Sequence, residues 1–111
     1  MKYLKTFEKM NINIDDIQIG DYVYGEEDRN ESSKLLKDFT KNNICKVIDK
    51  DEKCSQICVV FDTVPHKKIQ SRFNIIKNKY SRWLSVPSNI IEFAPTIEEL
   101  EIKLTVKNYN L

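Results

Sequence analysis

An uninterrupted apolar run from Ile57 to Phe61 constrains the fold more than any other segment of this chain. Side chains on a β-strand alternate between two faces, so a strand that is apolar on both faces is buried on both and lies inside a sheet. A second β-rich run, 44–49, comes before it, and the charged link 50–53 separates that run from 56–62. This arrangement predicts a hairpin whose second strand is central.

The other β-rich segments are short and separated by turn residues, which is typical of small β domains. We expect further strands at Tyr22 to Tyr24, Arg82 to Val86, Ile90 to Phe93 and 101–108. In the last of these, Ile102, Leu104 and Val106 alternate with Lys and Thr, which is the period of a strand.

Helical signals are fewer, and each covers only a few residues. They rest on apolar residues three or four positions apart and on side chains that can cap a first turn. We expect a helix over 2–10, a helix capped by Ser32 or Ser33 and ended at Asn42-Asn43, and a single turn with the capping box Thr96 and Glu99.

The segment 67–78 fits two structures. Ile69, Phe73 and Ile76 share the face of a helix, whereas Ile69, Phe73 and Ile75 share one side of a strand. Periodicity does not decide between the two. Phe, Asn and consecutive Ile residues are poor helix formers, which favours a strand or an extended arm.

A length of 111 residues predicts one compact domain, 1–111, and two glycines and three prolines leave no room for a flexible linker. No segment approaches the roughly 20 apolar residues of a membrane span. Residues 1–10 alternate Lys with Leu and Phe and lack the apolar core of a signal peptide. We therefore expect a cytoplasmic protein without membrane contact.

Two segments resemble parts of SH3-like small β-barrels. Ile19-Gly20-Asp21-Tyr22-Val23 is similar to the turn that introduces an early strand, and Pro87-Ser88-Asn89-Ile90-Ile91-Glu92 resembles the Pro-Ser-Asn-Tyr-Val segment of the 3₁₀ turn before the last strand. The resemblance implies a mainly β fold with short helices, closed into an SH3-like small barrel. Ile90 stands where the family has the tyrosine of its polyproline groove, so ordinary PxxP recognition is not expected.

The nearly neutral formal charge of +1 conceals two oppositely charged segments. Residues 63–91 contain six basic residues and no acid, whereas 15–31 contain seven acids and the single base Arg29. Basic and aromatic residues together are what a surface needs to hold an acidic partner. The candidate contact residues are Lys67, Lys68, Arg72, Phe73, Lys77, Lys79, Tyr80, Arg82 and Trp83.

Nothing in the sequence has the pattern of a catalytic or metal site. His66 is the only histidine, and the spacing of Cys45, Cys54 and Cys58 matches no common zinc motif. Two glycines do not make a phosphate-binding loop. We expect no enzyme activity and no cofactor.

The segregated charges and near-neutral total favour a protein–protein interaction module over a dedicated nucleic-acid binder, because the latter is usually basic overall. The partner is expected to be a protein, for instance one that itself handles nucleic acid. The alternative is a small nucleic-acid-binding barrel that uses the basic–aromatic segment 66–83. Ile, Lys and Asn, which AT-rich codons encode, make up 39 of the 111 residues. That bias indicates an AT-rich genome and suggests a phage or mobile-element accessory that modulates a host protein.

Overall fold

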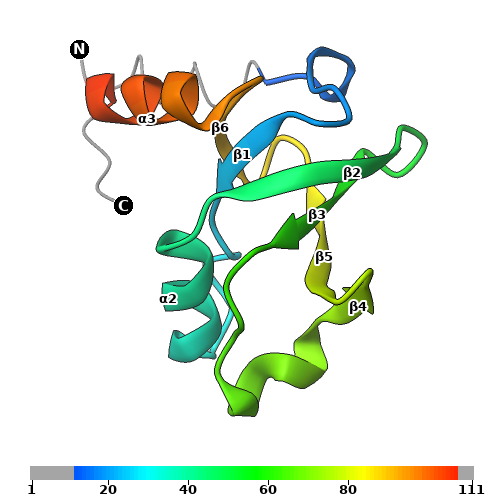
Figure 1. Cartoon of the computed structure of the whole chain (residues 1–111), viewed down its shortest axis with the longest axis vertical. Helices are drawn as coiled ribbons and strands as arrows, with labels where there is room; N and C mark the ends of the chain where they lie inside the picture. Colours follow the sequence, from blue (N-terminus) through cyan, green and yellow to red (C-terminus); the bar gives the residue numbers. More distant parts are fainter. Residues whose placement is uncertain (1–11, 108–111) are drawn as a thin grey trace.

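A six-stranded antiparallel sheet forms the centre of the computed structural model, which describes residues 12–107 (Figure 1). The neighbour order across the sheet is β4-β5-β3-β2-β1-β6. The strands are β1 (Tyr22–Gly25), β2 (Cys45–Asp51), β3 (Gln56–Phe61), β4 (Asn74–Ile76), β5 (Lys79–Ser85) and β6 (Ile90–Ala94). The 3₁₀ segments η1 (Ile14–Asp16) and η2 (Lys67–Arg72) and the helices α2 (Lys34–Lys41) and α3 (Ile97–Val106) surround them.

The apolar run that the sequence places inside the sheet is β3, and this prediction is confirmed. β3 pairs with β2 on one side and with β5 on the other, and a tight turn joins β2 to β3. The side chains of Ile57, Val59 and Phe61 enter the main core, where they are almost completely buried. The predicted hairpin is therefore present with its second strand in the interior of the sheet.

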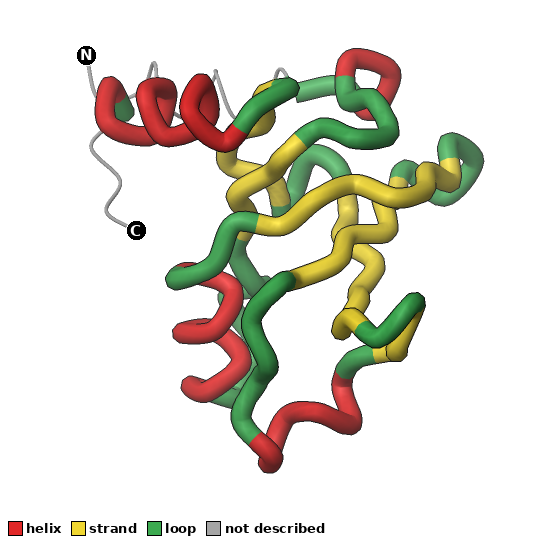
Figure 2. Tube along the Cα trace, viewed as in Figure 1, coloured by secondary structure: helices red, strands yellow, loops and turns green. Residues whose placement is uncertain are grey.

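The helix α2 begins and ends where the sequence predicts. The side-chain oxygen of Ser33 accepts a hydrogen bond from the backbone N–H of Leu36 (3.2 Å), and Asn42 caps the other end. Leu36 is fully buried in the main core, whereas Leu35 is exposed. Figure 2 shows α2 and η2 at one end of the sheet and α3 at the other.

Residues 97–106 form the helix α3, so the strand predicted over 101–108 is wrong for the described part of that range. Thr96 accepts a hydrogen bond from the N–H of Glu99 (3.1 Å), and the helix continues for three turns beyond this cap. Leu100 and Leu104, four positions apart, are buried against β6 and β1, while Ile102 is 65% exposed. The alternation of Ile102, Leu104 and Val106 thus mixes two opposite helix faces.

The ambiguous segment 67–78 divides into two parts. Residues 67–72 form η2, and residues 74–76 form β4, the short first strand of a hairpin with β5. The preference for an extended conformation is confirmed for β4 and wrong for η2. Ile69 of η2 and Phe73, which lies between η2 and β4, pack into the main core, and both periodicities include these two residues.

The sheet is open, so the barrel implied by the SH3 resemblance is wrong. β4 pairs only with β5, and β6 pairs only with β1, so the two edges do not meet. The described residues form one domain of mixed α/β type, with 33% strand and 28% helix, rather than a mainly β fold. The predicted helix over 2–10 lies outside the described residues, and within residues 12–107 no helix has the length and apolarity to cross a bilayer.

The two SH3-like segments are nevertheless turns at the expected places. Gly20 has a φ of +100°, and the carboxylate of Asp21 accepts a hydrogen bond from the N–H of Gln18 (2.8 Å) just before β1. Pro87 and Ser88 lie in the turn between β5 and β6. The Asn89 side chain holds this turn, because it accepts from the N–H of Ser85.

Candidate functional site

The acidic and basic segments meet inside the molecule. Arg72 Nη2 lies 2.7 Å from Glu31 Oε1, and Arg82 Nη2 lies 3.1 Å from Glu27 Oε1. Both carboxylates belong to the loop between β1 and α2, and both guanidinium groups come from the η2–β5 region. Opposite charges that the sequence places in separate segments therefore pair with each other within the fold.

The Arg82 ion pair is largely removed from solvent. The side chains of Arg82 and Glu27 are 16% and 6% exposed, and the Thr40 hydroxyl on α2 donates a second hydrogen bond to Glu27 Oε2 (2.7 Å). The Arg82 guanidinium also lies 5.5 Å from the centre of the Phe73 ring, within the range of a cation–π contact. Arg82 thus connects β5, the acidic loop and α2, and it is not presented to a partner.

The Arg72 pair lies nearer the surface and holds the pKa of the Glu31 carboxyl at about 2, well below its usual 4.5. The main cause is the hydrogen bond from Arg72, followed by one from the backbone N–H of Ser33 (2.9 Å). Both favour the charged carboxylate.

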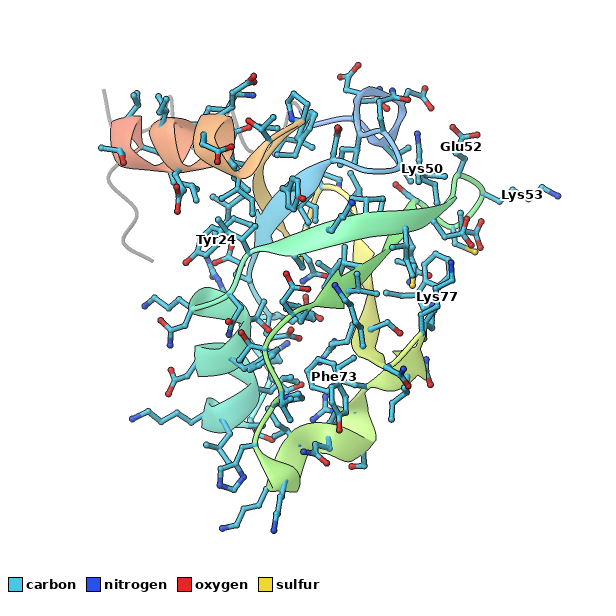
Figure 3. All side chains as sticks on the ribbon, in the orientation of Figure 1. Tyr24, Lys50, Glu52, Lys53, Phe73 and Lys77 are labelled. Carbon is cyan, nitrogen blue, oxygen red and sulfur yellow. The ribbon has the colours of Figure 1, made fainter. Side chains whose placement is uncertain are left out.

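Phe73 and Tyr80 are also internal contacts. Phe73 packs edge-on against Phe39 and Phe61, with ring centres 5.4 and 5.9 Å away, and Tyr80 packs against Phe73 at 6.1 Å. Figure 3 shows Phe73 within the fold, between the sheet and η2. These rings stabilise the core, so stacking on a nucleic-acid base is not available to Phe73.

Lys67 and Lys68 are exposed on η2, the segment that also carries Arg72. His66 precedes them, and its Nδ1 accepts a hydrogen bond from the backbone N–H of Lys68 (3.0 Å). The histidine therefore caps this 3₁₀ segment, which is a structural role.

Trp83, Lys77 and Lys79 remain together on the solvent face of the sheet. Alternation along β5 directs Arg82 and Leu84 to the core side and Trp83 to the opposite side, where it lies across from Cys58 of β3 and is 40% exposed. A shallow groove of about 540 Å³ surrounds it. Its lining is Lys46, Ile48, Asp49, Cys58, Val60, Ile76, Lys77, Lys79 and Trp83.

Three lysines and one acid, Asp49, line this groove, so its net charge favours an anionic ligand. Lys79 pairs with Asp62, and Lys46 lies 5.7 Å from the centre of the Tyr22 ring. Lys77 is exposed on the β4–β5 turn and has no acidic partner among residues 12–107. Its charge is therefore available to an acidic group.

Sequence reasoning missed the contributions of β2, β3 and β4 to this surface, namely Lys46, Ile48, Val60 and Ile76. A signal was present in the run 57–61. A strand with apolar residues on both faces has a second apolar face that must be shielded from water. Cys58 and Val60 lie on that face of β3 and form the floor of the groove.

The cysteines do not have the properties of nucleophiles. Burial raises the pKa of the Cys45 and Cys58 thiols, and the neighbouring Asp51 raises that of Cys54. A raised pKa lowers the reactive thiolate fraction at neutral pH. Residues 12–107 also hold no cluster of three or more His, Cys, Asp or Glu side chains arranged to bind a metal ion.

No protein-family model, curated protein or solved structure matches this chain.

Proposed function

We propose that this chain is a non-catalytic protein-binding domain whose contact surface is the groove around Trp83. The observation that carries the proposal is a half-exposed tryptophan on the solvent face of the central sheet, beside Lys77, which has no acidic partner in the described part of the chain. Tryptophan is among the residues most enriched at the energetic centres of protein interfaces. A solvent-exposed apolar patch with a polar rim is typical of an interaction site.

The composition of the groove supports a protein partner over a nucleic acid. Ile48, Val60 and Ile76 supply aliphatic surface, which accommodates an apolar side chain. Proteins that bind single strands present several aromatic rings to successive bases, whereas among the described residues Trp83 is the one aromatic side chain that lines this groove. The basic rim of Lys46, Lys77 and Lys79 favours a partner segment that also carries carboxylates.

The more specific form of the proposal is an accessory protein of a phage or mobile element that engages a host protein. Its support is the small single domain and the abundance of Ile, Lys and Asn.

The experiment is a selection of random displayed peptides on the purified protein, followed by affinity measurements on the selected peptides. Trp83→Ala is expected to weaken binding by about tenfold or more, because it removes a central anchor, whereas Trp83→Phe retains most of the affinity. Lys77→Glu is expected to weaken binding to acidic peptides. Lys53→Glu makes the same charge change at the tip of the β2–β3 hairpin and is expected to have little effect (Figure 3).

The same variants are then tested with a fluorescein-labelled oligothymidine at increasing salt. Oligothymidine binding that weakens steeply with salt and is lost in Trp83→Ala, together with a failure to select peptides, would move the function to nucleic-acid binding. Selected peptides that bind equally well to wild type and Trp83→Ala would place the interaction on another surface.

A further inference from the structure

Among residues 12–107, β5 is the one strand that pairs with β4, so β4 is an edge strand of the sheet. Its three residues are all exposed, and Ile75 is 66% exposed. Edge strands in native proteins usually carry a charge, a proline or a bulge that prevents pairing with another chain. The sequence Asn74-Ile75-Ile76 contains no charge, proline or bulge, and its one protective feature of this kind is its length of three residues.

The opposite edge is protected. β6 leads into α3, and the Lys103 ammonium donates a hydrogen bond to the backbone carbonyl of Phe93 on β6 (3.0 Å). A second lysine of this segment, Lys107, pairs with Glu92 of the same strand. The two edges of one sheet thus differ, and only the β4 edge adjoins the groove around Trp83.

We propose that the partner binds by β-strand addition, as an extended segment that pairs with β4 and places apolar and acidic side chains over the groove. This inference rests on the proposed function and specifies how the partner is held. Main-chain hydrogen bonds to an edge strand supply affinity in such complexes, while pockets for alternate side chains supply specificity.

The hairpin geometry identifies the pairing groups. Lys77 and Asn78 both have positive φ (51° and 67°), as in a two-residue type I′ turn, and Ile76 lies opposite Lys79. Residues that flank such a turn exchange their hydrogen bonds, so the N–H and C=O of the next residue, Ile75, point away from β5. Ile75 therefore offers a donor and an acceptor to an added strand.

The side chains expected on the added strand follow from the residues of this protein that they would contact in the groove. Ile76 is the β4 side chain that lines the groove, and Lys77 and Lys79 lie at the adjacent turn. Asp49 is the one acid among the described residues that line the groove, against the three lysines Lys46, Lys77 and Lys79, so the net charge of the groove still attracts carboxylates. A segment that alternates Ile and Glu on one face matches these contacts.

The test uses a labelled peptide, Ile-Thr-Glu-Thr-Ile-Thr-Glu, in which Ile and Glu share one face and Thr occupies the other. A second peptide carries N-methyl groups on alternate residues, which removes main-chain donors and leaves the side chains unchanged. Both are titrated against wild type, Ile75→Pro and Ile75→Thr. Proline removes only an outward-facing N–H and is tolerated on edge strands, whereas threonine keeps that N–H.

We expect the unmodified peptide to bind wild type and Ile75→Thr within about threefold of each other. N-methylation of the peptide, or Ile75→Pro, is expected to lower the binding affinity by about tenfold or more. A tenfold change in affinity corresponds to roughly 1.4 kcal/mol, which is the scale of one to two hydrogen bonds. The methylated peptide is measured on unaltered protein, so this result does not depend on how Ile75→Pro folds.

Equal binding of both peptides to wild type would overturn strand addition and leave the groove as a side-chain binding site. Absence of binding by wild type up to about 1 mM peptide would also overturn it, while the peptide selection above tests the proposed function separately. A third outcome is that the chain forms a dimer, that Ile75→Pro abolishes this dimer, and that the peptide does not compete with it. This outcome would assign the β4 edge to a second copy of the chain instead.

Discussion

Glu27 Oε1 and Arg82 Nη2 are 3.1 Å apart although 55 positions separate the two residues in the chain. One belongs to the acidic segment and the other to the basic segment. Their pairing shows that opposite charges concentrated in different parts of a sequence can be complementary within one fold. Fewer of the basic and aromatic residues are therefore exposed than the sequence suggests, and the contact surface that we propose is the groove around Trp83.

Because this pair is largely buried, removal of one partner is expected to be costly. Glu27→Ala leaves the Arg82 charge uncompensated and should lower the free energy of unfolding by about 3 kcal/mol. Chemical denaturation measures this change. Asp16→Ala removes an exposed acid of the same segment and should change stability by less than about 0.5 kcal/mol. Equal effects of the two substitutions would contradict a structural role for Glu27.

The Glu31 carboxylate makes part of the stability dependent on pH. Its pKa in the folded protein is about 2, below the ordinary value of 4.5, so folding favours the charged form. The stabilisation is fully present above about pH 4.5 and is lost as the pH falls towards 2. We expect the stability difference between wild type and Glu31→Gln to shrink over this range.

The measurement is urea denaturation of both proteins between pH 7 and pH 2, with NMR titration of the Glu31 carboxyl in wild type and Arg72→Met. Arg72 is the largest cause of the lowered pKa, so the midpoint should rise in the variant. A midpoint that does not change would assign the shift to another group.

The helical structure of 97–106 predicts opposite outcomes for two neighbouring apolar residues. Leu100→Ala creates a cavity in the cluster between α3 and the sheet and should cost about 2–5 kcal/mol. Ile102→Ala alters an exposed side chain and should cost under about 0.5 kcal/mol. Thermal unfolding distinguishes them, and a large loss from Ile102→Ala would instead support the strand pattern.

Gly25 is required where β1 approaches the β5–β6 turn. A Cβ at this position would lie 2.5 Å from the backbone oxygen of Asn89, the same oxygen that accepts the N–H of Glu26. Gly25→Ala should therefore displace this turn and cost about 1–3 kcal/mol. Chemical denaturation measures the free energy of unfolding of this variant and of Ser88→Ala, a control that changes an exposed residue in the same turn. A neutral Gly25→Ala would mean that the turn shifts freely.

Local patterns in the sequence were sufficient for features that depend on neighbouring residues. The Ser33 and Thr96 caps, the β2–β3 hairpin and the interior position of β3 follow from short-range hydrogen bonding and from the period of the side chains. The extent of α3 did not follow, because the alternation over 102–106 carries no information on which residues meet a neighbouring element.

The candidate site divides in the same way. The sequence by itself determined that 63–91 contains six basic residues, three aromatic residues and no acid, since composition is a property of the chain. Only the tertiary structure decided that Arg72, Arg82, Phe73 and Tyr80 have internal partners, whereas Trp83 stays 40% exposed and Lys77 has no acidic partner among residues 12–107. It also decided that the sheet stays open. The physical reason is that ion pairs, ring contacts and strand closure join residues far apart in sequence, and their formation depends on how all the elements pack.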